Sequence, residues 1–278
     1  MTTVTLFSDI TYAEVDGRAL QLDLYLPDIE GPVPAVLYVH GGGWAHGDKA
    51  DDAQTRLLPA AAHGIAVLSV NYRLAPAAVY PAQIHDVKAA IRWTRAHGAA
   101  YRLHTDAIGL WGVSAGAMLT SLAGLTPNDL ELEGMLGEDR DQSSAVQAIA
   151  HWFGPTDFVT TATRSPLEAR LMPPPVEHTL LGSGTANEIA AKARDASPIG
   201  RVTASAPPLL IVHGDRDRLV PIADAEAFHA ALSRCGAHST FVSVAGAGHD
   251  DPMFDSGATI AITAAFLRAV LTPSLTVS

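Results

Sequence analysis

One serine of this chain stands in a setting that could make its hydroxyl a nucleophile. An apolar run, Ile108-Gly-Leu-Trp111, leads into Gly112-Val-Ser114-Ala-Gly116, and small residues follow. On a sharp turn between a strand and a helix, such a serine is held in a strained conformation with its hydroxyl exposed at the helix N-terminus. The alternative is a glycine-rich turn with an unreactive serine, since Gly-x-Ser-x-Gly also occurs by chance. Its position between a predicted strand and a predicted helix favours the nucleophile.

A second motif, His40-Gly-Gly-Gly-Trp44, directly follows an apolar run that ends at Val39. Glycine has no Cβ, so the amides of this loop can approach a ligand closely. Acyl transfer places negative charge on a carbonyl oxygen, and preorganised amides stabilise that charge. A phosphate-binding loop would need Gly-Lys-Ser/Thr, and the nearby Gly47-Asp48-Lys49 does not supply it. A plain turn is the other alternative, but two such motifs in one chain favour acyl transfer.

A serine nucleophile needs a base, and twelve histidines are candidates. His249 lies in the tight loop Gly246-Ala-Gly-His249, just after the strand-like stretch 241–244. We therefore favour His249 as the base. His213 is interpreted as structural, and the imidazole of His40 is expected to brace the glycine loop.

The base in turn needs a carboxylate to orient it, and two aspartates are available. Asp215 and Asp217 both follow the apolar run 209–212. We favour Asp217 as the orienting group and interpret Asp215 as a turn-forming residue. The serine, aspartate and histidine would then all follow strands at the carboxyl edge of a parallel sheet, where such sheets place their sites.

The apolar pattern predicts the elements that must position these groups. Continuous apolar runs, typical of strands covered on both faces, occur at 35–39, 65–70, 108–111, 146–149 and 209–212. Helical spacing at 83–97 and 222–232 alternates with them, which predicts an α/β fold with a mostly parallel sheet and helices on both faces. The alternating segment 20–26 predicts a strand with one buried face.

Two segments interrupt this alternation. The acidic, glycine-containing stretch 126–144 is expected to be a solvated loop. The stretch 158–197 contains Pro173-Pro-Pro175 and Gly182-Ser-Gly184, and we expect a lid or substrate wall there rather than a second domain. The prediction is therefore a single domain over residues 1–278.

Composition excludes several classes of function. The 278 residues are 48% hydrophobic, enough for a large core, and the net charge of −11 makes nucleic acid a poor partner and favours neutral substrates. The single cysteine, Cys235, excludes an intrachain disulfide framework and a cysteine-based zinc site. The first nine residues lack the pattern of a signal peptide, and no apolar run reaches the roughly 18 residues of a membrane span. We expect a cytoplasmic protein, with a homodimer as the default assembly.

Taken together, these motifs resemble the carboxylesterases of the α/β-hydrolase superfamily. The similarity is to the hormone-sensitive-lipase group and to the feruloyl/acetyl-xylan esterase-like (BD-FAE-like) branch, and it extends from about residue 20 to the C-terminus. The matching segments are His40-Gly-Gly-Gly-Trp44, Asn71-Tyr-Arg-Leu-Ala-Pro76, Tyr80-Pro-Ala82, Asp86, Gly112-x-Ser114-x-Gly116, Trp152-Phe-Gly-Pro-Thr-Asp157, Ala196-Ser-Pro198, His213-Gly-Asp-x-Asp217-x-x-Val-Pro221 and Gly246-x-Gly-His249.

The resemblance implies an α/β-hydrolase fold with a small lid insertion, and a role for each matching residue. Ser114 would be the nucleophile, His249 the base and Asp217 its orienting carboxylate. The amides of Gly42, Gly43 and Ala115 would form the oxyanion hole. The implied reaction is hydrolysis of neutral, short-chain or aryl carboxylic esters through an acyl-enzyme, without metal or cofactor.

Two alternatives stay open at this stage. An amidase of the arylformamidase type could use the same three side chains. A hydrolase-fold protein that only binds a partner or small molecule is the other possibility. Such proteins commonly lack one member of the triad, whereas this chain has a candidate for each.

Overall fold

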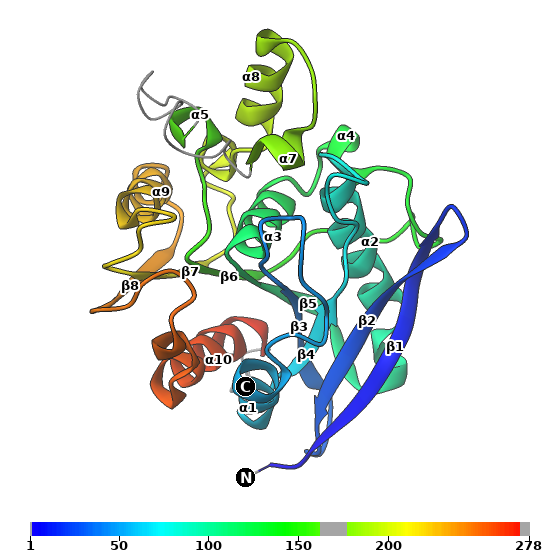
Figure 1. Ribbon diagram of the computed structural model, residues 1–278. Coiled ribbons are helices and arrows are strands. Elements are labelled where there is room, and N and C mark those ends of the chain that lie inside the picture. The colour runs from blue at the N-terminus through cyan, green and yellow to red at the C-terminus, as the bar shows by residue number, and fades with distance from the viewer. Residues whose placement is uncertain (1, 162–176, 273–278) are drawn as a thin grey trace.

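A twisted sheet runs through the centre of the molecule (Figure 1). The computed structural model describes residues 2–161 and 177–272, and within these residues eight strands form one sheet. Its order is β1-β2-β4-β3-β5-β6-β7-β8, and only the β1–β2 and β2–β4 pairs are antiparallel. The strands are β1 (Val4–Val15), β2 (Arg18–Pro27), β3 (Val33–Val39), β4 (Ala66–Val70), β5 (Leu103–Val113), β6 (Ala148–Trp152), β7 (Leu209–Gly214) and β8 (Ser239–Val244).

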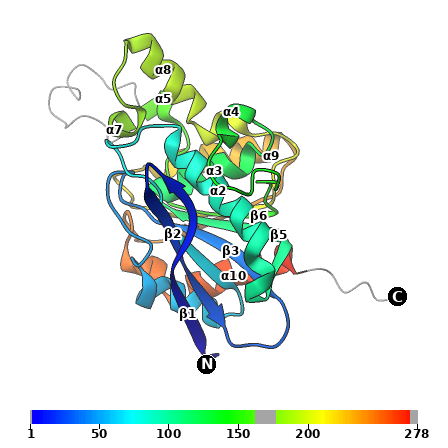
Figure 2. The same ribbon diagram turned by 90° about the vertical axis from the view of Figure 1, so that its right-hand side faces the viewer.

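Helices cover both faces of this sheet (Figures 1 and 2). The apolar sides of α2 (Ala82–His97), α3 (Ala115–Leu125) and α9 (Ile222–Arg234) contribute to one core. On the opposite face, α1 (Leu58–Ala62) and α10 (Gly257–Leu271) contribute to a second core. The predicted α/β architecture, a mostly parallel sheet with helices on both faces, is confirmed. The described chain also has four short helical turns, which are η1 (Ala53–Leu57), η2 (Gly98–Tyr101), η3 (Pro198–Arg201) and η4 (Pro252–Asp255).

The five continuous apolar runs form the parallel strands β3 to β7, as expected. The run at 146–149 is displaced, since β6 begins at Ala148 and continues through Trp152. The strand β1 was not predicted, because most of its residues are exposed at the sheet edge and give no apolar pattern.

The prediction of one buried face for the segment 20–26 is wrong. From Leu22 onward β2 is buried on both sides, because it lies inside the sheet between β1 and β4. Tyr25 packs into the second core. The carboxylate of Asp23 is compensated by the Lys49 ammonium, 3.0 Å away.

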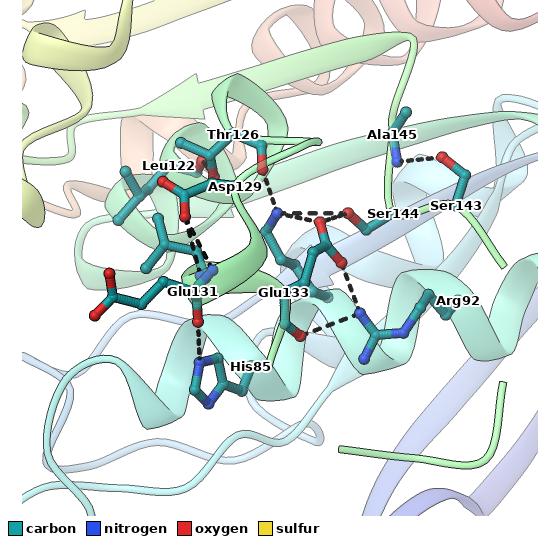
Figure 3. A network of polar contacts seen from close by, with 12 residues as sticks. His85, Arg92, Leu122, Thr126, Asp129, Glu131, Glu133, Ser143, Ser144 and Ala145 are labelled. Carbon is teal, nitrogen blue, oxygen red and sulfur yellow. Dashed lines mark hydrogen bonds and ion pairs between the residues drawn. The ribbon is translucent and has the colours of Figure 1, made fainter. Parts of the chain in front are cut away.

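The acidic stretch 126–144 is not simply a solvated loop. It contains α4 (Leu130–Glu133), whose Leu132 is buried and whose first turn is capped by the Asp129 carboxylate. Glu133 points inward and accepts hydrogen bonds from Arg92 at 2.8 Å and from Lys88 at 2.6 Å (Figure 3). Glu133 turns inward because two buried cations on α2 require a carboxylate partner.

The stretch 158–197 includes three described helices, α5 (Phe158–Thr161), α7 (Glu177–Leu181) and α8 (Ala186–Asp195), which lie beyond the carboxyl ends of the strands (Figure 1). The Tyr80 hydroxyl donates to Asp195 at 2.6 Å, and its amide donates to Leu180 at 2.8 Å, so this layer is fixed to the body. Residues 162–176, with the predicted Pro173-Pro-Pro175 segment, lie outside the described residues. No helix in the described part of the chain is both long and apolar enough to cross a bilayer.

Candidate active site

Ser114 occupies the turn between β5 and α3, with φ 50° and ψ −121°. This left-handed φ is strained for a residue with a Cβ, and surrounding contacts must hold it there. The backbone amide of Ser114 donates to the carbonyl oxygen of Trp152 at 2.9 Å. The helix approaches β3 closely, because a Cβ at Gly116 would overlap the carbonyl oxygen of Val39. The predicted strand–turn–helix setting of the serine is therefore present.

The imidazole of His249 lies between the other two predicted side chains. Its Nε2 is 2.8 Å from Ser114 Oγ, and its Nδ1 is 2.7 Å from Asp217 Oδ2. The histidine side chain is mostly buried, with 16% of its surface exposed. Three residues from separate parts of the chain thus form one hydrogen-bonded series, in which Nδ1–H donates to the carboxylate and Nε2 is oriented toward the serine hydroxyl.

Asp217 is held as a buried carboxylate. Its Oδ1 accepts the amides of Leu219 and Val220, both at 2.9 Å, and its side chain has no exposed surface. Burial alone would raise the pKa of Asp217, but hydrogen bonds from His213, His249 and the Val220 amide hold it well below its usual range. The group therefore stays ionised at neutral pH.

Asp215 makes no hydrogen bond to the imidazole, and it lies in a turn after β7, as expected, across which the Asp217 amide donates to the Gly214 carbonyl at 3.3 Å. Its carboxylate is exposed and accepts the amide of Gly246 at 2.6 Å, from the loop that precedes His249. The two aspartates thus have different roles: Asp217 hydrogen-bonds the histidine ring, and Asp215 hydrogen-bonds the loop that carries the histidine. His213 is fully buried and bonds the Val220 carbonyl at 2.9 Å, as expected of a structural residue.

The glycine loop lies directly against the serine turn. A Cβ at Gly41 would come within 3.3 Å of the Ser114 Cβ. Within the described residues, the amides of Gly42 and Gly43 make no hydrogen bond. The Gly42 carbonyl accepts a hydrogen bond from the amide of His46 at 3.0 Å, which closes the turn. The amide of Ala115 is the first of α3 and has no acceptor within that helix. These three amides are therefore available as donors beside the serine.

His40 braces this loop from within. Its Nδ1 is 2.8 Å from the Gly41 carbonyl oxygen, and its ring stacks on Tyr72 with centroids 4.5 Å apart. Burial lowers the pKa of His40. Because a carbonyl oxygen can only accept, Nδ1–H is the donor in this hydrogen bond. The Tyr72 hydroxyl donates to the His40 carbonyl at 3.2 Å. The Asn71-Tyr-Arg-Leu segment thus supports the glycine loop.

Several supporting residues were missed by the sequence reasoning. Phe153 meets the His249 ring edge-on at 5.2 Å, and Phe254 packs on Phe153 at 4.4 Å. His151 is fully buried between the Ser121 hydroxyl at 2.8 Å and the Gly154 carbonyl at 3.0 Å. Phe153 and Gly154 belong to the Trp152-Phe-Gly-Pro motif, which was the available signal, although nothing in it indicated which ring each would contact.

The aromatic and apolar residues near the motifs differ in their surroundings. Trp152 belongs to the core, where it meets Trp111 at 4.9 Å. Trp44 is also buried and contacts Phe158 edge-on at 5.5 Å. Leu219 and Met253, in contrast, are 66% and 45% exposed beside the aspartate and histidine loops.

In the described chain, no group of three or more potential ligands is placed to hold a metal ion.

Comparison with known proteins connects this geometry to a family and its relatives. Residues 22–232 match the BD-FAE family model. The chain is 36% identical to esterase LipC of Mycobacterium tuberculosis, over 86% of this chain and 59% of the relative. It is 35% identical to the probable carboxylic ester hydrolase LipM of the same organism, over 79% of this chain and 50% of the relative. The chain thus spans between half and three-fifths of the length of these curated relatives.

Solved structures extend the similarity to nearly the whole chain. A carbohydrate esterase from gut microbiota, solved in truncated form, superposes with a TM-score of 0.86 at 31% identity, covering 96% of each chain. The esterase Est2 of Thermogutta terrifontis, with propionate bound, superposes with a TM-score of 0.76 at 25% identity, covering 98% of this chain and 96% of the other.

Proposed function

We propose a function for this chain from one premise: it belongs to the BD-FAE family of α/β-hydrolases. On that premise, the protein is a serine carboxylesterase that hydrolyses neutral carboxylic esters through an acyl-enzyme. The observation that carries the proposal is the hydrogen-bonded series from Ser114 Oγ through His249 to Asp217, with steps of 2.8 and 2.7 Å. The names of the relatives, which are esterases, support the same reaction class.

The geometry supports a separate role for each group in the proposed reaction. Ser114 Oγ attacks the carbonyl carbon of the ester while His249 Nε2 takes its proton. The ionised Asp217 stabilises the imidazolium that results. The amides of Gly42, Gly43 and Ala115 donate to the oxyanion of the tetrahedral intermediate, where their orientation is fixed in advance.

The second half of the cycle reverses these proton transfers. His249 gives its proton to the departing alcohol, and the carbonyl re-forms as an acyl-Ser114 ester. His249 then removes a proton from water, which attacks this ester, and returns that proton to Ser114 Oγ as the carboxylic acid is released. Proton and acyl transfers account for every step, so the proposed mechanism uses no metal and no cofactor.

The proposed substrates are neutral, short-chain or aryl esters. The solved esterase with propionate bound supports a short acyl group in the substrate. The carbohydrate esterase supports an ester formed on a hydroxyl group of the alcohol part. The net charge of −11 opposes polyanionic substrates.

The first experiment compares the parent protein with Ser114→Ala on a series of p-nitrophenyl esters from acetate to palmitate. We expect turnover to be greatest for short acyl groups and to fall at least about 10³-fold in the variant, with an unchanged melting temperature. A fluorophosphonate probe should label the parent at Ser114 and leave the variant unlabelled. Undiminished turnover by Ser114→Ala would refute the assignment, and a parent that does not react would indicate a binding protein.

Residues 1–278 form a single catalytic domain, in which 158–197 acts as a lid or substrate wall. The protein works in the cytoplasm, which the single cysteine favours. It forms a homodimer, the commonest assembly of soluble proteins. Subcellular fractionation and sedimentation equilibrium test the last two.

A further inference from the structure

A buried arginine lies behind the histidine loop. The side chain of Arg56, on the π-helix η1, is 2% exposed and contacts three carboxylates. Its guanidinium lies 3.0 Å from Asp52, 3.1 Å from Asp250 and 2.7 Å from Asp255. Asp52 is four residues away in the sequence, but the other two are 194 and 199 residues away. One cation therefore joins η1 to the segment that follows His249.

The guanidinium is well suited to this position. Its N–H donors lie in one plane at fixed angles, so it can donate hydrogen bonds to several oxygen atoms in different directions at once. The Tyr38 hydroxyl is a further partner at 3.1 Å, and the Trp152 ring centroid lies 5.4 Å from the guanidinium carbon. A lysine ammonium would retain the charge but lose this planar arrangement of donors.

The two distant carboxylates hold both ends of one short segment. Asp250 directly follows His249, and Asp255 is the last residue of η4. Asp250 has φ 49°, a left-handed conformation that aspartate adopts more readily than alanine does. The Asp250 carboxylate is 53% exposed, so the ion pair with Arg56 rather than burial anchors it.

The ring of His249 depends on this loop for its position. Its two hydrogen bonds, to Ser114 and Asp217, leave little room for displacement, and a misplacement of about 1 Å can reduce a rate about a hundredfold. Asp215 fixes the loop before the histidine through Gly246. On the other side, Arg56 fixes Asp250 and Asp255.

We propose that Arg56 is a positioning residue for His249, which it holds in register with Ser114 and Asp217 by clamping Asp250 and Asp255. This inference rests on the proposed function, since the register serves proton transfer. Arg56 itself contacts no reacting atom and acts only through the loop.

The matched control is Arg92, a second buried arginine with a carboxylate partner. Its side chain is 3% exposed and donates to Glu133 at 2.8 Å (Figure 3). It also donates to the Leu136 carbonyl at 2.8 Å. These contacts join α2 to the α4 region and include no loop that carries Ser114, Asp217 or His249. Arg56→Lys and Arg92→Lys thus make the same chemical change in two buried ion-pair networks.

The test measures kcat and KM for p-nitrophenyl acetate together with the melting temperature of each variant. We expect both variants to have a lower melting temperature than the parent. Only Arg56→Lys should lose kcat, by about tenfold or more, while its KM stays within about twofold of the parent value. A kcat of Arg56→Lys within about twofold of the parent would overturn the proposal. An equal loss of kcat in Arg92→Lys would overturn it too, because the effect would then be general destabilisation.

Variants of the exposed Asp250 serve if Arg56→Lys does not fold. Asp250→Ala removes the ion pair and leaves a Cβ in the left-handed region, whereas Asp250→Gly removes the pair but tolerates that backbone. We expect kcat to fall in Asp250→Ala and to be partly restored in Asp250→Gly. Parent-level kcat in Asp250→Ala would contradict the clamp.

A spectroscopic measurement separates this inference from the proposed function. The Nδ1–H proton between His249 and Asp217 should give a far-downfield NMR resonance, assigned by its loss in His249→Ala. We expect Arg56→Lys to shift or broaden this resonance and Arg92→Lys to leave it unchanged. If the parent has no Ser114-dependent turnover, the proposed function fails, and this resonance alone decides the role of Arg56. An unperturbed resonance in Arg56→Lys refutes that role.

Discussion

Gly116 lies so close to the carbonyl oxygen of Val39 that no Cβ could be accommodated between them. Val39 ends β3 and leads into the glycine loop, while Gly116 is the second residue of α3, just after Ser114. The proposed oxyanion donors on the two segments are therefore brought together by one backbone contact. This contact explains physically why a glycine follows the serine at that spacing.

Gly116→Ala tests the contact. Forcing the extra methyl group against the Val39 carbonyl should separate α3 from β3 and lower the free energy of unfolding by about 1–3 kcal/mol. Turnover of p-nitrophenyl acetate should fall with it, because the glycine loop and the serine turn move apart. Gly257→Ala is the control, since a Cβ at Gly257 has no neighbour within 4 Å. Parent-like stability and turnover in Gly116→Ala would mean that the helix can shift without loss.

The unequal roles of the two aspartates give a second prediction. Asp217→Asn should reduce kcat by about 10³–10⁴-fold, because the amide can no longer stabilise the imidazolium or fix its tautomer. Asp215→Asn removes only a charge-assisted bond to the Gly246 amide and should reduce kcat by less than about tenfold. Steady-state kinetics of the two variants provide the check. Equal losses would show that Asp215 is as important to the histidine as the carboxylate that contacts it.

Tyr72 is predicted to support the glycine loop without taking part in chemistry. Tyr72→Phe keeps the ring that stacks on His40 and removes the hydrogen bonds to the His40 and Gly41 carbonyls. We expect a loss of about 1 kcal/mol in stability and less than about a tenfold loss in kcat.

The matched control for this variant is Tyr12→Phe. The Tyr12 hydroxyl donates to the Asn71 carbonyl at 2.7 Å and, among the described residues, makes no hydrogen bond to the glycine loop itself. It should lose similar stability in thermal unfolding and keep its kcat. A kcat loss of a hundredfold or more in Tyr72→Phe would assign its hydroxyl a direct part in the reaction.

The parts of the site that sequence could predict are those that follow buried strands. Ser114, Asp217 and His249 each stand a few residues beyond an apolar run, and parallel strands bring their carboxyl ends to one edge. That rule placed them together without any knowledge of contacts. It could not decide between Asp215 and Asp217, because their positions in the turn differ by two residues and only the backbone path determines which carboxylate faces the imidazole.

The residues that sequence could not predict are those whose partners are distant in the chain. Arg56 looks like an ordinary surface arginine until its partners 194 and 199 residues away are known. Glu133 was assigned to a solvated loop because its neighbours in sequence are acidic, yet α2 presents two buried cations to it. In both cases the charge pattern along the chain carries no information about which charges meet.

The buried His151 gives a prediction for stability against pH. Burial lowers the pKa of His151 to about 4, while hydrogen bonds to the Gly154 and Ala117 carbonyls only partly oppose it. In an unfolded chain its pKa would be about 6.5. Between these two values the unfolded chain binds more protons than the folded one, so the free energy of unfolding falls as the pH decreases. The contribution is fully present above about pH 6.5, and about 3 kcal/mol of it is lost on going to pH 4.

Urea unfolding of the parent and of His151→Gln at half-unit steps from pH 7 to pH 4 isolates this effect. The lowered pKa of His40 acts in the same direction, so the difference between parent and variant is the informative quantity. The lowered pKa of Asp217 affects a different pH range, because the stability that this carboxylate contributes is lost only as the pH falls below about 4. We expect His151→Gln to be less stable than the parent at pH 7 and to lose less stability toward pH 4. Parallel curves across this range would show that His151 accepts a proton in the folded protein as readily as in the unfolded chain.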